Sequence, residues 1–112
     1  MEKRNLTKLV EFSDAGAHQE TVFRTEHLRS EIICLDKNQE TDPMTDPGAD
    51  AMFTVIAGEV VVYVDRRFKR FKQWDATVAS AASAVVIKNA ASEPAVVLVV
   101  AAPPAEDASD HA

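Results

Sequence analysis

The chain has 112 residues, of which 46% are hydrophobic and 27% charged, and its formal net charge is −6. This length and composition predict one soluble globular domain with a single core. Three acidic residues (Glu106, Asp107 and Asp110) lie near the end, so the body of the chain carries about −3 (−6 plus 3). An acidic body repels the phosphate backbone, so we expect no binding of nucleic acid.

The first residues lack the apolar core of a signal peptide, and no stretch is long enough to cross a bilayer. We therefore expect no membrane partner. Cys34 is the single cysteine, which excludes an internal disulfide. Both observations favour a reducing, cytoplasmic location.

In chain order, residues 1–19 form an N-terminal segment, with either a short helix or an edge strand within 6–12. Beyond it, short runs rich in β-branched residues are bounded by Gly, Pro, Asn, Asp or Ser, which is typical of strands. These runs are 20–25, 28–35, 52–57, 60–64, 66–72, 85–89 and 95–100. Their spacing predicts an all-β sandwich or barrel. Gly58 stands where a tight turn accepts a positive φ. Residues 104–112 follow two prolines and predict a flexible acidic tail.

The spacing of two segments resembles the two motifs of the small single-domain cupins. The first family motif reads G-x5-H-x-H-x4-E-x6-G, and here its frame runs from Asn38 to Gly58 and keeps the last glycine. The second reads G-x5-P-x-G-x2-H-x3-N, and here its frame runs from Trp74 to Asn89 and keeps Asp75 and the closing asparagine. The resemblance covers roughly residues 20–103. It implies a cupin-type double-stranded β-helix, also called a jelly-roll barrel, that pairs as a homodimer.

In metal-binding cupins, three histidines and one carboxylate hold a divalent ion. Carried over by position, those four places hold Met44, Asp46, Ala51 and Val85. Asp46 is the one hard oxygen donor among them, and Met44 offers a single soft sulfur. Carried over in this way, the resemblance implies neither a metal ion nor another cofactor.

Strand alternation indicates which side chains share a face. The predicted interior consists of Met44, Ala51, Phe53, Val55, Val85 and Ile87, with Asp46 and Ser83 as polar members. Two interpretations remain open. In one, the core has closed up and Asp46 faces solvent as a turn residue of "DPMTDPGAD". In the other, a mostly apolar pocket has one acid at its mouth, as small-molecule sites often do.

Three further residues are pocket candidates. An inward Arg24 or Arg29 would clamp a carboxylate ligand. Their opposite parity predicts that at most one points inward, unless a bulge intervenes, and a surface arginine is the simpler alternative. His27 with Glu26 resembles the proton-abstracting pair of some metal-free cupins similar to sugar epimerases. Strict alternation, however, turns these two side chains to opposite faces.

Two other features have a simple structural explanation. The run "RRFKRFK" (66–72) carries five basic residues and two phenylalanines, which is compatible with stacking on RNA. Phe68 and Phe71 have opposite parity, however, which favours a hairpin strand with packed phenylalanines and solvated cations. Cys34 lies in an apolar run, which favours a small buried hydrophobe over a reactive thiolate.

Three functions follow from these observations. The leading prediction is a metal-independent cupin-domain protein that binds or senses an unknown small molecule in an apolar barrel pocket. The second is an enzyme, either a metal-free isomerase or lyase with Asp46 or His27 as the base, or an oxygenase. The third is a structural dimer with a filled barrel, in which the apolar strand 95–100 offers an edge or a face to the second copy.

Overall fold

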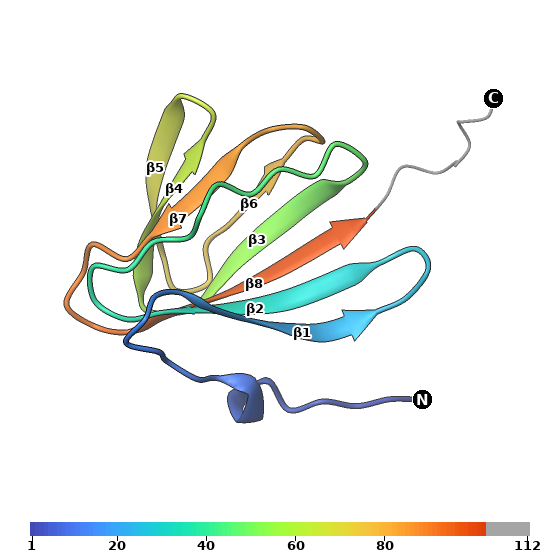
Figure 1. The fold of residues 1–112 in the computed structure, drawn as a ribbon, viewed down its shortest axis with the longest axis horizontal. Coiled ribbons are helices and arrows are strands. Elements are labelled where there is room, and N and C mark those ends of the chain that lie inside the picture. Colours follow the sequence, from blue (N-terminus) through green and yellow to red (C-terminus); the bar gives the residue numbers. More distant parts are fainter. Residues whose placement is uncertain (103–112) are drawn as a thin grey trace.

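The structure, a computed structural model, describes residues 1–102 and is almost entirely β (Figure 1). Its elements are η1 (Leu6–Leu9), β1 (His18–Arg24), β2 (Arg29–Leu35), β3 (Asp50–Ala57), β4 (Glu59–Val64), β5 (Arg67–Lys72), β6 (Ala76–Ala79), β7 (Val85–Lys88) and β8 (Ala95–Ala102). Each predicted strand is present, with ends shifted by at most two residues. The predicted tail, 104–112, and the last residue of the predicted barrel lie outside the described residues. No helix in the described part is long and apolar enough to cross a membrane.

The strands form two antiparallel sheets that face each other. One sheet has the order β1-β2-β8-β3-β6, and the other has the order β5-β4-β7. The inner faces supply one apolar core that includes Ile33, Phe53, Val62 and Val97. The prediction of an all-β fold is therefore confirmed.

Strand β6 was not among the predicted strands. Its sequence, "ATVA", is only four residues long, and alanine has little preference for strands. Pairing with β3 places Val78 opposite Met52 and Thr77 opposite Phe53. The strand thus forms because it pairs with the free edge of β3. This contact is long-range, so the residues of β6 alone do not predict it.

Strand 95–100 was expected to offer an edge or a face to a second copy, and the structure excludes the edge. Strand β8 is central, because it pairs with β2 on one side and with β3 on the other. Val97 and Val99 face the core between the sheets, whereas Val96 packs against a second apolar cluster on the outer side. Burial of both faces explains why the run reads as continuously apolar.

The N-terminal segment covers the outer face of the larger sheet (Figure 1). Residues Leu6–Leu9 form a 3-10 helix, whose first turn is capped by the Asn5 side chain accepting from the Thr7 amide at 3.0 Å. Leu9 then packs with Val22, Ile32 and the fully buried Cys34. Burial raises the pKa of the Cys34 thiol, so this cysteine is the small buried hydrophobe that the sequence favours.

The segment 36–49 follows the free edge of β7 and extends the smaller sheet without forming a regular strand. Met44 and Val85 exchange two backbone hydrogen bonds of 2.9 Å, and the Thr41 amide donates to the Ile87 carbonyl at 2.9 Å. An isolated bridge joins Glu40 to Lys88 in the same antiparallel sense. This segment closes one side of the sandwich and brings Met44 beside Val85.

The two ends of the sandwich differ. The end marked by Leu35, Gly58, Asn89 and Ala95 is packed, and we call it the closed end. Gly58 has a φ of 78° and lies against Pro94 and Ala95. The opposite end, where β2 begins and β8 finishes, is the open end.

Candidate functional site

The open end contains a cavity of about 160 Å³ between the two sheets. The inner faces of β2, β3, β6, β7 and β8 contribute to it, together with β1 and segment 36–49. Its lining consists of Gln19, Arg29, Glu31, Met44, Thr45, Asp46, Ala49, Ala51, Phe53, Ala79, Ser80, Ser83, Val85 and Val99. One wall is therefore polar and the other apolar.

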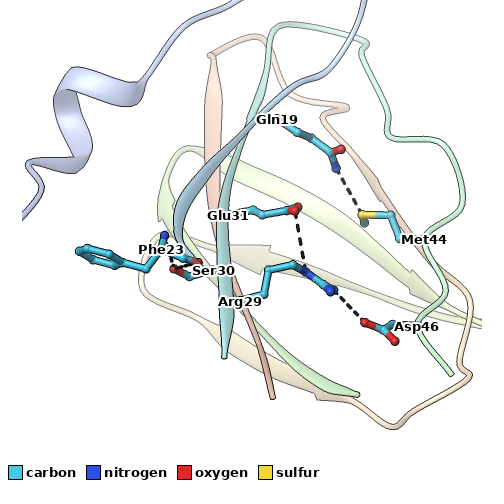
Figure 2. A network of polar contacts seen from close by, with 7 residues as sticks. All are labelled: Gln19, Phe23, Arg29, Ser30, Glu31, Met44 and Asp46. Carbon is cyan, nitrogen blue, oxygen red and sulfur yellow. Dashed lines mark hydrogen bonds and ion pairs between the residues drawn. The ribbon is translucent and has the colours of Figure 1, made fainter. Parts of the chain in front are cut away.

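The polar wall is organised around Arg29 (Figure 2). An Arg29 guanidinium nitrogen lies 2.9 Å from Asp46 Oδ2, and Arg29 Nε lies 3.8 Å from a Glu31 carboxylate oxygen. The Gln19 amide nitrogen donates to Met44 Sδ at 3.5 Å. Figure 2 shows Arg29 between the two carboxylates, with Glu31 on its own strand and Asp46 on the facing segment.

Local sequence explains both sides of this wall. On β2, Arg29 and Glu31 alternate with outward residues and share the inner face with Ile33 and Leu35. Asp46 is held by its own turn, because its Oδ1 accepts from the Gly48 amide at 3.0 Å. Asp46 therefore acts as a turn residue and also lines the cavity, so features of both interpretations of "DPMTDPGAD" are present.

The hydrogen bond from Arg29 holds the pKa of the Asp46 carboxyl below its ordinary value, and the Gly48 amide acts in the same direction. About a third of each side chain of the Arg29–Asp46 pair is exposed. Asp46 is therefore a stable anion at neutral pH and a weak proton acceptor.

Seven predicted pocket residues line this cavity. They are Arg29, Met44, Asp46, Ala51, Phe53, Ser83 and Val85. Val55 and Ile87 share the predicted inner face, but they are buried in the packed core beyond the cavity.

Arg24 and His27 lie outside the cavity. Arg24 is exposed and pairs across the β1–β2 hairpin with Arg29, so both arginines occupy one face. Parity along the sequence does not decide their faces, because the two residues lie on different strands joined by a turn, but of the two only Arg29 lines the cavity, within the predicted limit of one. Arg24 instead lines a neighbouring groove of about 290 Å³ that also includes Arg29 and Asp46. His27 sits in the hairpin turn with its side chain 84% exposed.

The sequence analysis missed four polar residues of the cavity, of which Gln19 and Glu31 belong to the polar wall and Thr45 and Ser80 lie in loops. Glu31 carried a usable signal, because it stands two residues after Arg29 on one strand and must share its face. Gln19 carried none, since its inward position depends on the pairing of Gln19 with Ile33.

The four side chains that the resemblance places at metal-ligand positions do not form a donor set for a divalent cation. Asp46 is the one oxygen donor among them, and both of its oxygens already accept hydrogen bonds. The adjacent Arg29 guanidinium would also repel an incoming cation. Within the described residues, ligand atoms of Glu11, His18 and Glu20 lie within 4.8 Å of one another, but this group is outside the barrel.

Comparison with solved structures identifies the fold. No family model matches the sequence, and no curated protein matches it. Among solved structures, the protein TT1209 from Thermus thermophilus is similar with a TM-score of 0.86 and 27% identity, over 92% of this chain and 98% of that one. A Klebsiella pneumoniae protein with a double-stranded β-helix domain has a TM-score of 0.86 and 20% identity, over 94% of this chain and 92% of that one.

A cupin superfamily protein from Desulfitobacterium hafniense has a TM-score of 0.76 and 13% identity, over 92% of this chain and 94% of that one. The two facing antiparallel sheets and these similarities show that this chain has the double-stranded β-helix fold, the fold of cupins.

Proposed function

We propose that this cupin domain binds a small organic molecule in the open-end cavity without the help of a metal ion. The observation that carries the proposal is the division of the cavity into an Arg29-centred polar wall and an apolar wall. Concave sites of this composition are typical of small-molecule binding.

The size of the cavity limits the ligand. An apolar protein cavity of about 150 Å³ accommodates benzene. The cavity here has a similar volume of about 160 Å³, so we expect a ligand of about six to eight heavy atoms. Its carbon skeleton would lie against Ala51, Phe53, Val85 and Val99, and its polar group would reach the Arg29 wall.

The charge of the polar wall further restricts the ligand. Arg29 stands between the two carboxylates of Glu31 and Asp46, which leaves the group with a net charge of −1. An anionic ligand would have to displace Asp46 from Arg29. We therefore favour an uncharged or cationic polar group, in place of the carboxylate that an unpaired arginine would select.

The enzyme hypotheses receive less support. A general base works best with a pKa near the operating pH, whereas Arg29 lowers the pKa of Asp46. His27 is exposed, away from the cavity, and an oxygenase would need a metal that the donor set does not fit. A completely filled barrel is disfavoured by the cavity itself. The homodimer and the cytoplasmic location stay predictions.

The proposal is tested by thermal shift and isothermal titration calorimetry with four probes of similar size. Phenol and cyclohexanol are neutral, isopentylamine is cationic, and isovalerate is anionic. We expect saturable binding of at least one neutral or cationic probe, and binding of isovalerate at least about tenfold weaker. Ala51→Leu, which fills the cavity, is expected to abolish binding, whereas Asp42→Asn on the exposed part of segment 36–49 is the control.

Two outcomes would contradict the proposal. No saturable binding of any probe would favour the filled barrel and a structural role. A stoichiometric transition metal in the purified protein, lost in Asp46→Ala and kept in Asp42→Ala, would replace the metal-independent function with a metal-dependent one.

A further inference from the structure

A second cleft, of about 630 Å³, opens on the side of the sandwich between strands β5 and β6. Each of these strands ends its own sheet, so the gap between the layers lies between two edges. Figure 1 shows β5 at the free edge of the smaller sheet, on the side away from the covering segment 36–49. The lining of the cleft includes Val62, Val64, Arg67, Lys69, Phe71 and Thr77.

Two cationic side chains belong to the inner face of the smaller sheet. Lys69 pairs across the strands with Val62, and Arg67 pairs with Val64. Directly paired residues share a face of a sheet, and both valines pack in or against the main core. Phe71, on the same parity of β5, also packs against this core. Arg67 and Lys69 therefore lie on the face of the smaller sheet that borders the cleft, where both are exposed to solvent.

Neither of these two cations has an acidic partner in the part of the chain that the structure describes. Within residues 1–102, no ion pair of 4.0 Å or less involves Arg67 or Lys69. By contrast, Arg70 on the outer face of the same strand contacts Glu59 at 2.7 Å. The cleft carries three cations, Arg66, Arg67 and Lys69, against one carboxylate, so its local charge is +2 in a chain of net charge −6.

The remaining walls suit the non-polar part of a ligand. Val62, Val64 and Phe71 provide an apolar floor on one sheet. Thr77 stands opposite on β6, and because it pairs with the core residue Phe53 it also faces inward. Its hydroxyl adds one hydrogen-bonding group to a mostly apolar surface.

We propose that this side cleft binds small organic acids that have an apolar body. The acid group contacts Arg67 and Lys69, and the hydrocarbon part covers Val62, Val64 and Phe71. This site is separate from the open-end cavity, whose charge favours the opposite kind of ligand, and it does not depend on the function proposed for that cavity. The competing explanation is that inward cations only prevent pairing of the exposed edge of β5 with another chain.

The test uses octanoate below its micelle-forming concentration, with octanol, octylamine and acetate as comparison probes, measured by calorimetry with the whole protein. We expect saturable, salt-sensitive binding of octanoate, with each other probe at least about tenfold weaker. Arg67→Gln/Lys69→Gln is expected to weaken octanoate binding at least about tenfold. Arg70→Gln/Lys72→Gln changes the net charge equally on the outer face and should change the affinity less than about twofold.

A second pair of variants avoids altering the cations. Val78 is 67% exposed at the rim of the cleft, and its cross-strand neighbour Met52 is 46% exposed but does not line it. Val78→Glu places a repelling carboxylate at the rim and should weaken octanoate binding about tenfold, whereas Met52→Glu should not.

The proposal is overturned if octanoate does not saturate, or if the inner-face and outer-face variants weaken binding equally. It is also overturned if Arg67→Gln/Lys69→Gln self-associates without any change in octanoate affinity, because the cations then only protect the edge. Loss of octanoate binding in Ala51→Leu would place the ligand in the open-end cavity and would likewise contradict a separate site.

Discussion

The closed and open ends of the sandwich are built from the same strands, but they are organised differently. At the end of β2 that carries Ile33 and Leu35, the inner face is fully buried and apolar. At the other end of that strand, the inner face carries Arg29 and Glu31 and borders a cavity. The same alternation positions both sets, so one strand contributes to stability at one end and to a candidate binding site at the other.

Because of this division, substitutions should affect the free energy of unfolding and ligand binding differently at the two ends. At the closed end Leu35, Asn89 and Ala95 are fully buried, so changes there should reduce the free energy of unfolding. The open end has volume and exposed charges, so changes there should alter ligand binding more than stability.

The largest difference in stability loss is expected between substitutions of two glycines, one at each end. A Cβ on Gly58 would collide with the Pro94 carbonyl oxygen and lie 2.9 Å from Ala95 Cα, at a φ of 78°. Gly58→Ala should therefore lower the free energy of unfolding by about 2–5 kcal/mol. At the open end, a Cβ on Gly48 would meet only Asp46 Oδ1 at 3.8 Å, so Gly48→Ala should cost less than about 1 kcal/mol. Urea unfolding of both variants measures the contrast, and equal losses would contradict it.

Asn89 provides the next test of the closed end. Its buried amide donates to the Leu35 carbonyl at 3.0 Å and to the Glu93 carbonyl at 2.8 Å, and its oxygen accepts from the Ala91 amide. Asn89→Ala leaves these groups without partners and should cost about 2–4 kcal/mol. Gln73→Ala, which removes an exposed hydrogen bond to the Ile56 carbonyl, should cost less than about 0.5 kcal/mol in the same unfolding experiment. A loss below about 1 kcal/mol for Asn89→Ala would show that the closed end relaxes easily.

Enlarging an inward-facing side chain should also cost more stability at the closed end than at the open end. Ala95 is fully buried at the closed end, so Ala95→Leu should overpack the core and cost about 1–3 kcal/mol. Ala51 borders the open-end cavity, so Ala51→Leu should cost less than about 1 kcal/mol. Thermal unfolding checks both values. If Ala51→Leu were as damaging as Ala95→Leu, the cavity would not have room for a ligand.

The smallest expected effect concerns the Arg29–Asp46 pair. Asp46→Asn should lower stability at pH 7 by about 0.5–1 kcal/mol, because the pair is partly exposed. The folded-state pKa of Asp46 is lowered, so its contribution is present above the unfolded pKa of about 4 and is lost as the pH falls through the folded value. The stability difference between the wild type and Asp46→Asn should therefore shrink between pH 5 and pH 2, as followed by urea unfolding. A difference independent of pH, or one equally present in Asp42→Asn, would show that Arg29 does not hold Asp46.

Much of the fold was predictable because the relevant signals are local. The runs at 52–57 and 60–64 have the residues of strands, and Gly58 between them marks the turn. Alternation also placed Ala51, Phe53 and Val85 correctly on the inner face. Strand β6 and the central position of β8 were not predictable in this way, because both depend on pairing with residues far away in the chain.

The candidate site was only partly predictable for a similar reason. Asp46 was singled out from its position, but its partner Arg29 is 17 residues earlier on another strand. The parity argument for Arg24 and Arg29 compared residues across a hairpin, where sequence parity no longer defines a face. Lys69 and Arg67 are exposed, as expected for solvated charges, and only the register with Val62 and Val64 places them on the side of the sheet that borders the cleft.

The burial of Cys34 beneath the N-terminal segment has a practical consequence. Its thiol is inaccessible while Leu9 covers the outer face of the sheet, and a raised pKa keeps it protonated. A thiol-alkylating reagent can therefore reach this single natural cysteine only when the segment lifts away or the whole domain opens. The rate of alkylation in native buffer thus reports detachment of the first residues, without any engineered label.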